Sequence, residues 1–162
     1  MIAAFMPIKI FVDTEFTDFV DSQLISLGMV SERGAEFYVE VPYSLEACSD
    51  FVRETVLPLL GQIPDAYCAL ADLPEKILNW FEVVREDEEI EVCFDYQKDW
   101  DLLIHALDYQ VPQWCTSRLV ARNINALLLY EFYKKHGLPE HHALYDARAN
   151  RHAFRNRPAV TS

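Results

Sequence analysis

The order of apolar and polar positions predicts a run of strands followed by alternating helices and strands. Residues 8–15 form a nearly continuous apolar run, which is typical of a central strand covered on both faces. The stretches "QLISLGMVSE" and "AEFYVEVP" follow, separated by "RG", and predict an antiparallel hairpin. Two later strands are expected at "EVCFDY" and "QWCTSRLV". The pattern therefore predicts an α/β fold with a mixed five-stranded sheet, in which the first strand is central and helices flank both faces.

Helical periodicity and end signals place the helices between these strands. The expected helical stretches are "LEACSDFVRETVL", stopped by Pro58, then "DLPEKILNWFEVV", "DWDLLIHAL", "NALLLYEFYKKHGLP" and "ALYDARANRHAF". Asp72 is a plausible cap with Pro74 in the first turn, and Gly137 is a stop signal. The acidic run "REDEEIE" is expected to be a solvated turn.

Composition favours one globular domain spanning residues 1–162, because 51% of the chain is hydrophobic. The N-terminal "MIAAFMPIKIFV" is expected to lead into a buried strand, since it lacks the basic start of a signal peptide. No apolar run approaches the roughly 20 residues that span a bilayer, so no membrane partner is expected. The cysteines are widely spaced, which favours core thiols in a reducing cytoplasm over zinc ligands or disulfides.

Charge is unevenly distributed within a net charge of −12. Residues 114–162 hold eight Lys and Arg against three acids, whereas residues 1–113 hold six against twenty-three. Three of the basic residues, Arg148, Arg151 and Arg155, fall on one stripe of the last expected helix, where a solvated face is the favoured interpretation. Composition alone therefore neither supports nor excludes a nucleic-acid partner.

Two carboxylates end the first expected strand, within "KIFVDTEF". Asp13 and Glu15 are two residues apart, so their side chains project to the same face of the sheet. Like charges held side by side repel unless a proton, a cationic side chain or a metal ion compensates them. Lys9 is the only nearby cation and lies at the far end of the strand. This pattern indicates a metal site at the carboxyl end of a central strand, where open sheets commonly place their sites.

A histidine and an acid stand five residues apart in "HHALYDARA". On an uninterrupted helix, His141 and Asp146 would point about 140° apart. They can converge only if His141 lies in the loop or first turn after Pro139, which is where the helix signals place it. His142 breaks the five-residue spacing and ranks second.

Three motifs together resemble those of the DEDDh 3′-to-5′ exonucleases, which have a ribonuclease H-like fold. "VDTEF" is similar to the first motif of that family, "DWDLL" to the second and "HHALYDA" to the third. The resemblance covers the chain from about Phe5 to Phe154. Within the family, "DTEF" and "LISLGMV" look most like the ribonuclease AS group, compact bacterial exoribonucleases that favour adenylate-rich RNA.

The resemblance implies a two-metal hydrolysis with Mg²⁺ or Mn²⁺, the ions that hard oxygen ligands suit. It implies that Asp13 bridges the ions and that Glu15 and Asp146 hold one of them. His141 would be the general base, since its unperturbed pKa near 6.5 is suitable. Phe16 is a candidate for stacking on a terminal base, although a core role is equally compatible with the sequence.

The second motif leaves its acid open, because "CFDYQK" replaces the usual His-Asn lead-in. Asp99 is favoured, since it falls within the apolar face of its helix whereas Asp101 points toward solvent. Asp99 capping its own helix is the competing interpretation, and Asp95 is the next candidate.

The favoured function is a cytoplasmic exoribonuclease acting on the 3′ end of single-stranded RNA and releasing nucleoside 5′-monophosphates. Two alternatives remain: a single-stranded DNA exonuclease of repair or proofreading, and a catalytically idle nucleic-acid-binding family member. The sequence leaves open whether the protein is a homodimer.

Overall fold

A mixed five-stranded sheet forms the centre of the computed structural model, which describes residues 6–156. Residues 1–5, at the start of the expected approach to the first strand, lie outside the described residues. In spatial order the strands are β3 (Glu36–Glu40), β2 (Leu24–Ser31), β1 (Ile8–Phe16), β4 (Ile90–Phe94) and β5 (Cys115–Leu119). β1 pairs antiparallel with β2 and parallel with β4. The predicted α/β class, the hairpin and the central first strand are confirmed, and the arrangement is consistent with a ribonuclease H-like fold.

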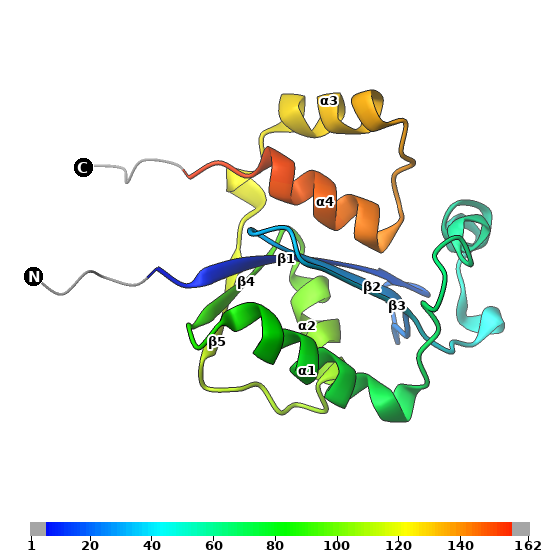
Figure 1. The fold of residues 1–162 in the computed structure, drawn as a ribbon. Helices are drawn as coiled ribbons and strands as arrows, with labels where there is room; N and C mark the ends of the chain where they lie inside the picture. The colour runs from blue at the N-terminus through cyan, green and yellow to red at the C-terminus, as the bar shows by residue number, and fades with distance from the viewer. Residues whose placement is uncertain (1–5, 157–162) are drawn as a thin grey trace, which may run out of the picture.

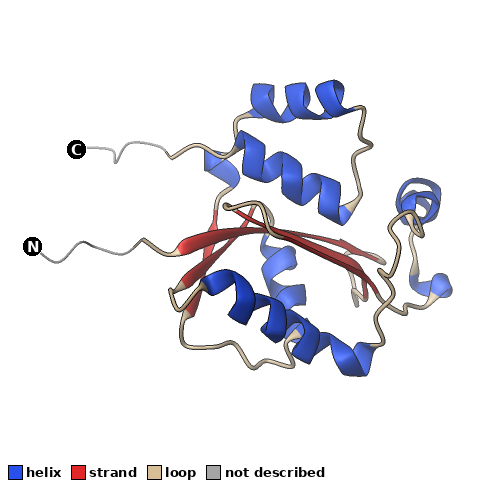
Figure 2. Cartoon of the chain, viewed as in Figure 1, coloured by secondary structure: helices blue, strands red, loops and turns tan. Residues whose placement is uncertain are grey.

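Helices cover both faces of this sheet (Figures 1 and 2). The α-helices are α1 (Leu73–Arg85), α2 (Gln97–Ala106), α3 (Ala126–His136) and α4 (Ala143–Ala153). Figure 1 shows α1 and α2 on one face, α4 on the other, and α3 stacked outside α4. Successive side chains of β1 point to opposite faces of the sheet. Ile8, Ile10 and Val12 are buried in the main core with α1, whereas Phe11 faces the end of α4.

The helix ends follow the sequence signals closely. Asp72 occupies the N-cap of α1 with a proline in the first turn, although its side chain accepts no capping hydrogen bond. The Asn125 side chain accepts from the Leu128 N–H at the start of α3. Gly137 ends α3 in the left-handed conformation with φ of 60°, which glycine adopts without a steric penalty. These ends fix where the chain turns back toward the sheet before α4.

The expected single helix over residues 45–57 is wrong. The chain instead forms a 3₁₀ turn (Leu45–Ala47), a short π-helical stretch (Val52–Val56) and a second 3₁₀ turn (Leu57–Leu59). Pro58 explains why the helical turns before it are wider than those of an α-helix. Its ring excludes the carbonyl four residues earlier, and it has no N–H to donate. The Leu57 N–H accordingly bonds to the Val52 carbonyl, five residues back.

Gly28 on β2 allows α4 to lie directly on the sheet. A Cβ at this position would come within 2.5 Å of the Ala143 carbonyl carbon, at the first residue of α4. Only glycine leaves room for this approach between two backbones. The close contact fixes the start of α4, and with it His141 and Asp146, over the middle of the sheet.

All four cysteines are buried thiols, as predicted for core residues.

Within residues 6–156, no helix combines the length and the apolar character that crossing a bilayer requires.

Candidate active site

A cavity of about 750 Å³ opens at the carboxyl end of β1. Its polar wall contains the carboxylates predicted from the sequence and His141. Its apolar wall includes Phe16 and the irregular segment of residues 45–59, which contributes Phe51, Val52 and Val56. The sheet changes here from antiparallel to parallel pairing, so the elements flanking β1 diverge and leave space at its end.

Asp13 and Glu15 both line this cavity from β1, as expected for side chains two residues apart on one face of a strand. The Asp13 Oδ2 atom is buried and has no hydrogen-bond partner within residues 6–156. A buried carboxylate oxygen without a donor is costly, because desolvation is not compensated. This atom therefore fits a cation as its partner.

Asp99 is buried beside β1, whereas Asp101 is not. The Asp99 side chain is only 2% exposed and accepts hydrogen bonds from the Thr14 N–H at 3.2 Å and the Thr14 hydroxyl at 2.7 Å. No side chain caps α2, whose N-cap is Tyr96, so the capping interpretation is wrong. Asp101 is exposed and accepts from the Gln97 amide, away from the cavity. The inward orientation expected for Asp99 is confirmed.

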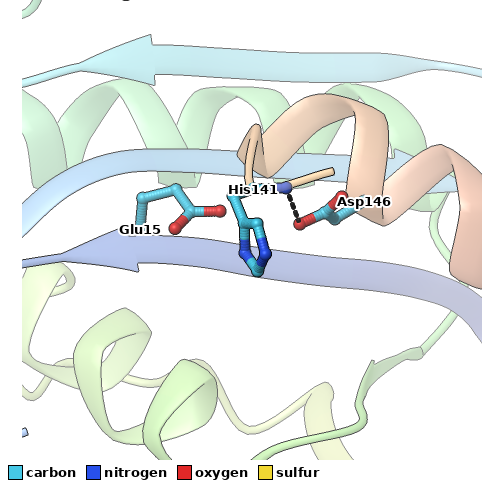
Figure 3. Close-up of side chains that lie close together, drawn as sticks. All are labelled: Glu15, His141 and Asp146. Atoms are coloured by element: carbon cyan, nitrogen blue, oxygen red, sulfur yellow. Dashed lines mark hydrogen bonds between the residues drawn. The ribbon is translucent and has the colours of Figure 1, made fainter. Parts of the chain in front are cut away.

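His141 lies in the turn before α4, the position that allows it to converge with Asp146. Its backbone is left-handed, with φ of 67°, and its N–H donates to Asp146 Oδ2 at 3.2 Å. Figure 3 shows the imidazole between Glu15 and Asp146 and directed toward β1. The Tyr133 hydroxyl donates to the other oxygen of Asp146 at 2.5 Å. A strained residue beside two carboxylates is a feature that functional sites often carry.

The titratable side chains form two groups of three. Glu15, His141 and Asp146 offer ligand atoms within 4.8 Å of one another, and Asp13, Asp95 and Asp99 do the same. Five of these six groups are carboxylates, and hard divalent cations such as Mg²⁺ and Mn²⁺ prefer oxygen ligands. The cluster could therefore hold a metal ion.

The electrostatics of the cluster reinforce this conclusion. Burial, followed by the charges of Asp99, Asp146 and Glu15, raises the pKa of Asp13 well above its ordinary value. Burial and the charges of Asp146 and Asp99 raise the pKa of Glu15 to about 8. Burial is also the largest cause that raises the pKa values of Asp99 and Asp146, each to about 7. Near neutral pH the carboxyls thus need protons or a cation to neutralise them.

His142 has a different environment from its neighbour. It is 2% exposed and stacks between Tyr38 and Tyr145, with ring centroids 4.8 Å and 3.8 Å away. Burial, with a smaller effect from Arg148, lowers its pKa to about 4. The structure therefore separates a cavity-lining His141 from a packed His142.

Phe16 contributes to the cavity and packs edge-on against Phe19, at 5.6 Å between centroids. Phe19 in turn contacts Tyr96 at 6.5 Å, and these two rings are largely exposed. The Lys98 ammonium lies 5.8 Å from the Phe16 centroid. Phe16 is thus half-buried at the cavity edge, a position open to stacking.

Three site residues were missed or ranked too low from the sequence. Asp95 was only an alternative to Asp99, yet both lie in one group with Asp13. Its position directly after β4, the parallel neighbour of β1, was the signal that could have found it. Tyr133 and Phe51 had no such signal, because α3 and the segment of residues 45–59 reach the site only through tertiary packing.

No protein-family model matches the chain, and no characterised protein matches it.

Proposed function

We propose that the protein is a metal-dependent exonuclease that hydrolyses single-stranded RNA from its 3′ end and releases nucleoside 5′-monophosphates. One observation carries the proposal. Carboxylates from β1, α2 and α4, together with His141, converge on one cavity in which a buried oxygen of Asp13 has no partner. The three motifs that resemble the DEDDh exonucleases are the segments that supply these residues.

The donor set fits two divalent ions, one at each group of three. Glu15 and Asp146, with His141 beside them, would hold one ion, and Asp95 and Asp99 the other, with Asp13 next to both. Bound Mg²⁺ or Mn²⁺ would stabilise the charge that develops on the attacking and leaving oxygens of the phosphodiester.

His141 is the residue suited to move a proton. It lines the cavity without a hydrogen bond to its imidazole among residues 6–156, so its ring nitrogens are free to face a water molecule. It would accept the proton of the attacking water as the water oxygen bonds to phosphorus and the bond to the leaving O3′ breaks. His142 is unsuited to this step, because both its ring nitrogens are buried.

Aromatic side chains at the rim support a single-stranded substrate. Phe19 and Phe51 both line the cavity and are 67% and 54% exposed. Aromatic rings stack on unpaired bases whatever their sequence, but cannot reach bases that are stacked within a duplex. A chain end with splayed bases is therefore the substrate that suits this rim.

The test uses RNA and DNA oligonucleotides of one sequence, each 5′-labelled and incubated with Mn²⁺ or Mg²⁺. We expect a ladder of RNA products shortened from the 3′ end, loss of the reaction in EDTA, and protection of RNA that carries a 3′-terminal phosphate. Asp13→Asn should be inactive, whereas Asp101→Asn, with the same charge change on an exposed side chain, should remain active. Cleavage of circular RNA at a comparable rate would contradict an exonuclease, and faster cleavage of DNA would contradict the RNA preference.

A further inference from the structure

A second cavity, of about 760 Å³, lies at the amino end of β1. It shares no lining residue with the candidate active site, which lies at the opposite end of the strand. Its walls come from β1, the β2–β3 turn and the facing sides of α3 and α4, which Figure 1 shows stacked on this face of the sheet. Its volume is within the range of small-molecule sites, about 300–1,000 Å³.

Lys9 is the most unusual residue of this cavity. It projects from the central strand and is only 7% exposed, although lysine is rarely buried without a partner. Its ammonium lies 5.9 Å from the Phe154 ring centroid, and no hydrogen bond or ion pair engages it among residues 6–156. The Lys9 side chain is thus buried in the wall of a cavity while its ammonium forms no ion pair within the described residues, so it is a ready partner for an anion.

Arg151 adds a second available cation. One guanidinium nitrogen donates to the Glu32 carbonyl at 3.0 Å, and the same Glu32 accepts the Lys9 backbone N–H through its carboxylate at 2.9 Å. Glu32 therefore accepts hydrogen bonds from both cationic residues and holds them on one side of the cavity. Arg148 differs, because Glu36 holds its guanidinium in two hydrogen bonds at 2.6 Å and 2.8 Å. The cavity thus contains three cations and two carboxylates, in a chain whose net charge is −12.

Aromatic and imidazole rings form the other side. Phe132 packs against His136 at 4.5 Å and against His152 at 5.4 Å between ring centroids. Both histidines are exposed and line the cavity. A flat ring entering beside them would find planar partners to stack on.

The geometry points to a nucleotide-binding site in this cavity, with the phosphate of a nucleoside monophosphate on Lys9 and Arg151 and its base against the Phe132, His136 and His152 rings. This assignment gives the arginine stripe of α4 a role other than a solvated face: Arg151 binds, and Arg148 is held by Glu36. It is independent of the proposed nuclease activity, because no residue of the active-site cavity takes part.

Calorimetric titration of the full chain with adenosine 5′-monophosphate in EDTA tests the site. We expect saturable binding that survives in Asp13→Asn. Lys9→Met and Arg151→Gln should each weaken binding about tenfold or more, since each removes a charge-assisted hydrogen bond. Lys76→Met on α1 and Arg33→Gln, which make the same charge changes outside the cavity, should bind as the unaltered protein does. Arg151→Gln alters an exposed side chain and keeps the test valid if Lys9→Met does not fold.

Adenosine and inorganic phosphate separate the two parts of the site. Each should bind more weakly than the monophosphate, because each occupies only one side of the cavity. Equal affinity for inorganic phosphate would overturn the stacking part of the assignment. If Asp13→Asn abolished binding while Lys9→Met and Arg151→Gln left it unchanged, the nucleotide would bind in the other cavity and the proposal would be overturned. The absence of binding at millimolar concentration would overturn it as well.

Discussion

Asp99 and Asp101 lie two residues apart on α2, yet only Asp99 is buried and bonded to β1 through Thr14. We predict that Asp99→Asn will fold normally, because the amide oxygen can still accept from Thr14, and that turnover will fall sharply. Asp101→Asn should change neither property. The measurements are melting temperature and the initial rate of RNA hydrolysis. A fully active Asp99→Asn protein would leave Asp95 as the acid of the second motif.

The two adjacent histidines should respond to alanine in opposite ways. His141→Ala should reduce hydrolysis about 10²- to 10⁴-fold if it is the general base, while the melting temperature stays close to that of the unaltered protein. His142→Ala removes a buried ring between Tyr38 and Tyr145 and should destabilise the fold by about 2–5 kcal/mol. Its activity should fall much less, when measured well below its melting temperature.

Calorimetry with Mn²⁺ decides between two roles for His141, which lies within ligand distance of Glu15 and Asp146. Unchanged Mn²⁺ affinity in His141→Ala would agree with a base, and a large loss of affinity would make the residue a ligand instead. Equal loss of activity in both histidine variants would refute the five-residue spacing argument.

At the scale of elements, the sequence predicted the strands and most helices because their periodicity and end signals are local. Residues 45–59 escaped prediction, because the pattern does not show how Pro58 widens the preceding turns or that the Ser49 N–H bonds to the Thr17 carbonyl. The same limit applies to the site. The spacing of Asp13 and Glu15 is local to β1, whereas the grouping of Asp95 with Asp13 depends on which strand pairs with β1.

The contact between β2 and α4 should be the most sensitive to added volume. Gly28→Ala would place a methyl group against the α4 backbone, and overpacking of this kind costs typically 1–3 kcal/mol. Because α4 carries Asp146 and the turn with His141, we expect both a lower melting temperature and weaker Mn²⁺ binding. Gly61→Ala is the control. Alanine would be strained at the φ of 79° that Gly61 adopts, but its Cβ would meet no atom within 4 Å, so Mn²⁺ binding should be unchanged. An unaltered Mn²⁺ affinity in Gly28→Ala would show that α4 can move without disturbing the site.

Over the whole molecule, the two cavities place opposite charges at the two ends of β1. The carboxyl end gathers the carboxylates of the candidate active site, and the amino end contains Lys9 and Arg151. α4 spans both, with Asp146 in its first turn and Arg151 in its last. The net charge of −12 therefore conceals a cavity with three cations against two carboxylates, which composition could not indicate, since the fold decides which charges lie together.

The acidic cluster should make stability depend on pH when metal is absent. Glu15, Asp99 and Asp146 have ordinary pKa values near 4, and the fold raises them to about 7 or 8. Between these values the folded protein holds more protons than the unfolded chain, so the free energy of unfolding decreases as pH rises. In EDTA the melting temperature should therefore be higher at about pH 5 than at about pH 8, each 1 kcal/mol corresponding to about 2–4 °C.

Divalent cations should reverse this loss, because they bind the deprotonated carboxylates of the folded state. Scanning calorimetry should show a larger increase in melting temperature with Mn²⁺ at about pH 8 than at about pH 5. Asp13→Asn should raise stability in EDTA at the higher pH, since it removes a buried charge whose Oδ2 has no partner, and should reduce the stabilisation by Mn²⁺. Asp101→Asn is the control, because it changes the net charge by the same amount at an exposed residue. It distinguishes repulsion within the buried cluster from repulsion across the whole acidic surface. If both variants shifted the pH dependence alike, the repulsion would belong to the whole surface and not to the cavity.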